Sequence, residues 1–119
     1  MSAKKVAVIV GSLRKEACNR KVANELIALG APDLAGEIVE IGQLPLYNQD
    51  DDDNPPAAST AFKQRLAAFD AVLFVTPEYN RSVPGVLKNA IDVGSRPYGK
   101  SVWRGKPAAV MHVCPGAIG

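Results

Sequence analysis

Three apolar runs in the chain have the pattern of buried β-strands. Residues 6–10 (VAVIV), 71–75 (AVLFV) and 108–113 (AAVMHV) are almost continuously apolar, which is typical of parallel strands covered on both faces. Residues 37–41 (EIVEI) alternate instead, and predict a shorter strand nearer an edge of the sheet.

Segments with a helical period separate these runs. Residues 20–29 carry apolar side chains on one side and end at Gly30, which predicts the first helix. A long polar loop, residues 43–56, precedes the second helix. Ser59 or Thr60 is expected to cap that helix, and its inward face is expected to hold Phe62, Leu66 and Phe69.

A third helix is predicted from about Ser82 to Asp92, with Pro84 in its first turn. Strands that alternate with helices predict an α/β fold with a doubly wound parallel sheet and right-handed crossovers. No linker or internal repeat divides the sequence, so residues 1–119 are expected to form a single domain.

The turn after the first strand, residues 11–19 (GSLRKEACN), has the composition of a phosphate-binding loop. Ligands bind beyond the carboxyl ends of the strands in such sheets, and a helix start offers unpaired N–H groups to an anion. Ser12, Arg14 and Asn19 are therefore candidate phosphate ligands. The alternative is a solvated turn in which Asn19 is only a helix cap. The turn matches neither G-x-x-x-x-G-K-[ST] nor G-x-G-x-x-G.

The turn after the 71–75 strand, residues 76–84 (TPEYNRSVP), is a candidate clamp for a flat ring. Pro77 makes the start of the turn rigid, and Tyr79 adds an aromatic surface beside backbone N–H donors. A flavin ring needs both features. The alternative is a proline-rich connection with Tyr79 as an ordinary surface residue.

Composition narrows the classes of function. The formal net charge of +2 is too small to indicate nucleic acid or a membrane surface as a partner, and no apolar run approaches membrane-spanning length. The two cysteines, Cys18 and Cys114, have neither metal-ligand spacing nor the pattern of a disulfide framework. Free thiols predict a reducing compartment, and hence a soluble cytoplasmic protein.

The second turn and the helix after it carry a resemblance to a known family. TPEYNRSVPGVLKNAID resembles the signature of the NADPH-dependent FMN reductases, a group with bacterial chromate and quinone reductases and related azoreductases. GSLRKEACN resembles the phosphate loop of that family, and LPLYNQD resembles the loop after its second strand. Through AIDVGSRPYGKSVW and CPGAIG, the chain is most similar to the soluble bacterial chromate and quinone reductases.

This resemblance implies a flavodoxin-like fold that holds FMN. In that scheme Ser12, Arg14 and Asn19 bind the phosphate, Pro77, Glu78, Tyr79 and Asn80 line the isoalloxazine ring, and the loop near Cys114 passes close to it. Arg81 is a candidate substrate contact, and no side chain is expected to act as a catalyst. The implied activity is ping-pong reduction of quinones, chromate or azo compounds by NADPH or NADH, in a homodimer or homotetramer.

Two departures from the family pattern leave alternatives open. The phosphate loop of the family usually carries serine where this chain has Ala17. The family fold continues with a fifth strand and a last helix, so the chain is expected to be truncated after its fourth strand, either as a fragment or as a natural product. A flavodoxin-type electron carrier and a truncated, non-catalytic fragment remain as alternative functions.

Overall fold

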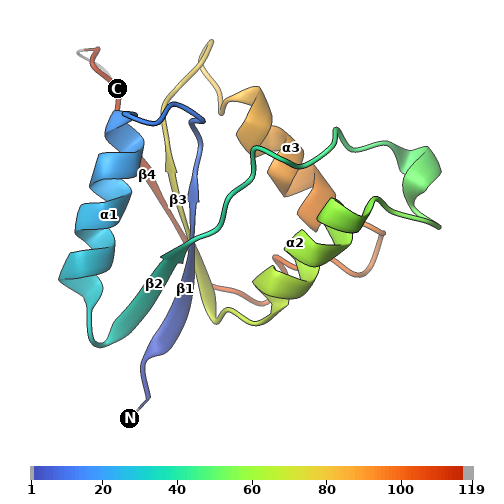
Figure 1. Ribbon diagram of the computed structural model, residues 1–119, viewed down its shortest axis with the longest axis horizontal. Helices are drawn as coiled ribbons and strands as arrows, with labels where there is room; N and C mark the ends of the chain where they lie inside the picture. Colours follow the sequence, from blue (N-terminus) through green and yellow to red (C-terminus); the bar gives the residue numbers. More distant parts are fainter. Residues whose placement is uncertain (1, 117–119) are drawn as a thin grey trace.

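A parallel four-stranded sheet runs through the computed structural model, which describes residues 2–116 (Figure 1). The strand order is β2-β1-β3-β4, and every pairing is parallel. Helix α1 covers one face of the sheet, and α2 and α3 cover the other (Figure 1). The elements, in chain order, are β1 (Lys4–Val10), α1 (Cys18–Gly30), β2 (Leu34–Ile38), a short 3-10 helix (Gln49–Asp51), α2 (Ala57–Ala67), β3 (Ala71–Thr76), α3 (Gly85–Gly94) and β4 (Ala108–His112).

The predicted doubly wound α/β fold is confirmed, and the apolar run of β1 shows why it forms. Ala7 and Ile9 belong to the core beneath α2 and α3, whereas Val8 and Val10 belong to a second core beneath α1. Because successive side chains of a strand point to opposite faces, a strand between two helical layers must be apolar at every position. Phe62, Leu66 and Phe69 are buried as predicted.

The second strand lies three residues earlier than the alternating pattern indicated. It spans Leu34–Ile38 instead of 37–41, in a register that pairs Lys4 with Leu34 and Val8 with Ile38. Val39 and Ile41 are buried in the core after the chain has left the strand. Their apolar character therefore reflects packing in the connection to α2, and it misled the prediction.

Prolines, and not hydroxyl side chains, precede the second and third helices. Pro56 is the N-cap of α2, so the prediction of a Ser59 or Thr60 cap was wrong; Ser59 is buried inside the helix. Pro84 is the N-cap of α3 and not a first-turn residue, because its ψ of 153° is extended. A residue that holds φ near −60° and needs no N–H suits the position just before a helix.

The fourth strand forms one edge of the sheet within the described residues. Its residues are largely exposed, and Val110 reaches 71%. The opposite edge is β2. None of the helices in residues 2–116 is long and apolar enough to cross a membrane.

Candidate functional site

The turns after β1 and β3 meet at the carboxyl end of the sheet (Figure 1). The Gly11 N–H donates to the Val75 carbonyl over 2.8 Å, which extends the β1–β3 pairing to the ends of both strands. A Cβ atom at position 11 would lie 2.2 Å from Thr76 Oγ1, well inside normal contact. Glycine is therefore required here for the first turn to lie directly beside the second.

A cleft of about 300 Å³ opens between the two turns. Its lining comes from the first turn, the second turn and the start of α3: Gly11, Ser12, Leu13, Arg14, Tyr79, Pro84, Gly85 and Val86. Arg14 is exposed and brings a permanent cation to this cleft. The first turn of α3 adds backbone N–H groups that have no partner within the helix, and with them a partial positive charge. The cleft therefore suits an anionic group beside an aromatic side chain.

Asn19 does not line this cleft, unlike Ser12 and Arg14. The N-cap of α1 is Ala17, so Asn19 is not the cap that the alternative interpretation required. Its buried side chain donates from Nδ2 to the Val113 carbonyl over 3.1 Å, and its Oδ1 is buried without a partner in residues 2–116. The side chain thus ties α1 to the end of β4, while its backbone N–H lies in the first turn of α1.

The second turn is a tight reversal held by its own backbone. The N–H of Tyr79 donates to the Ser82 carbonyl over 2.9 Å, and the N–H of Ser82 donates back over 3.1 Å. Between them Asn80 (φ 53°) and Arg81 (φ 64°) are left-handed, as in a type I′ turn. Asparagine adopts this conformation readily, whereas a long side chain such as that of Arg81 does so at a cost. The reversal places Tyr79, 51% exposed, in the wall of the cleft.

A second hollow of about 280 Å³ lies on the other side of this turn. Its lining is Thr76, Pro77, Glu78, Arg81, Ser82, Val83 and His112. Glu78 Oε1 is 3.9 Å from Arg81 Nε, and Glu78 Oε2 is 4.0 Å from His112 Nε2. The predicted ring residues are therefore divided: Tyr79 lines the first cleft, and Pro77 and Glu78 line the second. From the sequence, His112 is expected to be a satisfied core or strand-end histidine, but its Nε2 is buried without a hydrogen-bond partner in residues 2–116.

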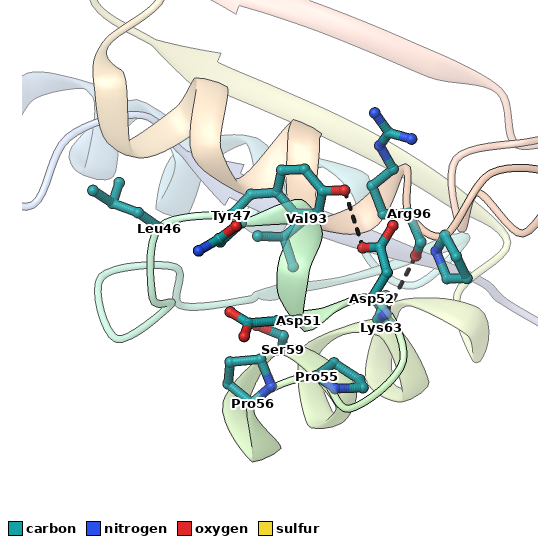
Figure 2. A pocket seen from close by; sticks show the side chains of 12 residues that line it. Leu46, Tyr47, Asp51, Asp52, Pro55, Pro56, Ser59, Lys63, Val93 and Arg96 are labelled. Carbon is teal, nitrogen blue, oxygen red and sulfur yellow. Dashed lines mark hydrogen bonds between the residues drawn. The ribbon is translucent and has the colours of Figure 1, made fainter.

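A smaller hollow of about 30 Å³ between the polar loop, α2 and α3 is structural (Figure 2). Tyr47 donates its hydroxyl to Asp52 over 3.0 Å, and the Arg96 guanidinium lies 5.3 Å from the centre of the Tyr47 ring. Burial, together with the Asp52 hydrogen bond, raises the pKa of Tyr47 above its ordinary value. The hollow has room for a water molecule or two and not for a nucleotide. These contacts hold the loop in place.

Comparison with known proteins places the chain in a family. The model of the NADPH-dependent FMN reductases matches residues 4–119, and the chain belongs to this family.

Similar proteins span a longer sequence than this chain. A quinone reductase of Pseudomonas putida is 65% identical over 115 residues, which are 96% of this chain and 62% of that protein. A 2-hydroxy-1,4-benzoquinone reductase of a Burkholderia species is 54% identical, over 97% of this chain and 63% of that protein. The structure of FerB, a flavoenzyme NAD(P)H:(acceptor) oxidoreductase of Paracoccus denitrificans, superposes with a TM-score of 0.92 at 49% identity, over 98% of this chain and 64% of that one.

Proposed function

We propose that this chain binds FMN and contributes to an NAD(P)H-dependent oxidoreductase that reduces quinones. The observation that carries the proposal is that Arg14 and Tyr79, from the turns after two neighbouring strands, line one cleft. A mononucleotide of this kind has an anionic tail and a flat head, and the cleft offers both a cation and an aromatic side chain.

The phosphate end of the proposed site is built from the first turn. Ser12 and Arg14 reach the ligand with their side chains, and Asn19 contributes through its backbone N–H at the start of α1. Each charge-assisted hydrogen bond contributes about 1.5–3 kcal/mol, so two such bonds suffice for useful affinity. The orphaned Oδ1 of Asn19 is an acceptor and would repel a phosphate, which is why its backbone is the better donor.

The ring end is built from Pro77, Glu78, Tyr79 and Asn80. The reversal uses the N–H groups of Tyr79 and Ser82 for itself. The N–H groups of Glu78 and Asn80 take no part in these two hydrogen bonds. We therefore assign them as donors to the polar edge of the ring. Preorganised backbone donors would also favour the negative charge of a reduced ring.

FMN, when bound, supplies hydride and electron transfer between a nicotinamide nucleotide and an oxidant. The chain itself binds and orients the reactants, with no side chain as covalent nucleophile or obligate acid. Arg81, whose side chain is 79% exposed at the rim of the turn, is the proposed contact for an anionic substrate. One shared binding face for donor and acceptor would make the kinetics ping-pong, with NADPH or NADH as the donor.

Quinones are the proposed acceptors because similar proteins are named quinone reductases. Chromate and azo compounds are further acceptors of the same redox class. We expect a homodimer or homotetramer, since Tyr98 and Leu46 expose 93% and 83% of their surfaces to solvent. The two free cysteines are consistent with a cytoplasmic location.

Anaerobic mixing of the FMN-loaded protein with NADPH tests the proposal. Rapid bleaching of the yellow absorbance, followed by recovery on addition of a quinone, is the expected result. A carrier of the flavodoxin type would stay yellow with NADPH alone, and a non-catalytic fragment would retain no FMN. Either result would refute the reductase activity.

A further inference from the structure

Glu78 lies between two cationic or protonatable partners at the ring end of the site. Its carboxylate is 3.9 Å from Arg81 Nε and 4.0 Å from His112 Nε2, so neither contact is a hydrogen bond. Arg81 is 79% exposed, whereas His112 is only 26% exposed. His112 is therefore the less exposed of the two partners of Glu78.

The ring nitrogen that faces Glu78 is itself unsatisfied. Nε2 of His112 is buried and has no hydrogen-bond partner in the described part of the chain. Buried polar atoms are paired in the great majority of native structures, and each exception needs a physical explanation. A movement of about 1 Å would bring the carboxylate and Nε2 to the distance of a charge-assisted hydrogen bond.

Of the two groups, Glu78 is the one that lies outside the sheet. His112 is fixed by the pairing of β4 with β3, where it lies opposite Thr76, and the Asn19 side chain holds the neighbouring Val113 carbonyl. Glu78 directly precedes the Tyr79–Ser82 reversal, which contains the left-handed Asn80 and Arg81. A strained segment of this kind keeps its shape only when the surrounding structure holds it.

We propose that His112 is a positioning residue for the ring-binding turn and that it acts through Glu78. Its Nε2–H group donates to the Glu78 carboxylate and fixes the Pro77–Ser82 turn in the shape that receives the flavin ring. The inference rests on the proposed FMN binding and adds a residue outside the predicted site.

His112 and Glu78 then act on ring affinity as one unit. Both line the same hollow, together with Arg81 from the turn. Loss of either member of the pair removes this hold on the turn, and loss of the second member adds nothing further.

The test is the FMN dissociation constant, measured by flavin fluorescence for the full chain, for His112→Gln, for Glu78→Gln and for the double variant. We expect each single variant to bind about tenfold more weakly, and the double variant to bind no more weakly than either of them. A purely structural role of His112 would make the two losses multiply in the double variant, and that result would overturn the inference.

Two points complete the design. Glu78→Gln, at a partly exposed position, tests the inference even if His112→Gln does not fold, because an unchanged FMN affinity would overturn it. Glu40→Gln removes a carboxylate paired with Arg20, and should keep the original dissociation constant. Failure of the unchanged chain to bind FMN would refute the proposed function itself. Independent losses in the two single variants would refute only the role of His112.

Discussion

Replacing Gly11 by alanine should separate the two turns that form the site. The added Cβ would lie 2.2 Å from Thr76 Oγ1, 2.7 Å from Thr76 Cβ and 3.2 Å from its Cα. Thr76 is 4% exposed and its hydroxyl donates to the Pro77 carbonyl over 2.9 Å, so the side chain has no free direction in which to turn. The ends of β1 and β3 must therefore move apart.

Overpacking of this kind costs about 1–3 kcal/mol. A contact this short against an immobile β-branched side chain lies at the upper end of that range. For a domain of this size, a loss of about 3 kcal/mol corresponds to a fall in Tm of roughly 10 °C. Because the displaced atoms border the cleft, the affinity for FMN should fall as well.

Thermal unfolding followed by circular dichroism, together with an FMN titration, measures both effects. Gly85→Ala is the matched control for thermal unfolding alone, because no atom lies within 4 Å of the Cβ it would add at the start of α3, whereas Gly85 itself lines the cleft. Thr76→Gly in the Gly11→Ala background should recover part of the lost stability, as it removes the two nearest atoms. Gly11→Ala with an unchanged Tm and FMN affinity would refute the close approach of the two turns.

Three other substitutions test separate parts of the site. Ala17→Ser places a hydroxyl at the N-cap of α1. It should stabilise the fold by about 1 kcal/mol and tighten FMN binding by up to about tenfold. An unchanged or weaker dissociation constant for FMN would count against the assigned phosphate position. Arg14→Gln should weaken FMN binding about tenfold or more and leave riboflavin, which has no phosphate, unaffected; equal losses for both ligands would place Arg14 elsewhere. Tyr47→Phe should lessen the loss of stability at alkaline pH in melts between about pH 8 and 11. The raised pKa of Tyr47 means that its stabilisation is complete below the unfolded value of 10.0 and is lost as the pH rises through the folded value, so an identical alkaline decline in the variant would contradict that assignment.

Much of the fold could be predicted because two strands are apolar on both faces. The continuous runs of β1 and β3 permit only a sheet with helices on either side. The position of β2 was harder, because Val39 and Ile41 are buried outside any strand and extend the apolar pattern beyond it. A local pattern reports burial and does not distinguish a strand from a packed connection.

The site was predictable as two turns and not as individual contacts. Parallel strands bring their carboxyl ends to one edge, which is why Arg14 and Tyr79 could be expected to lie together. The left-handed Asn80 and Arg81 then direct Tyr79 and Glu78 to different hollows, which residue types alone do not indicate. The place of His112 beside Glu78 could not be predicted, because it depends on the register of β4 with β3.

Backbone amide shifts recorded by NMR during an FMN titration test the central claim most directly. If one mononucleotide spans both turns, amides in residues 12–14 and 78–80 should shift together, along one binding curve. Shifts confined to one of these turns, or centred on the hollow around Tyr47 and Asp52, would contradict the account.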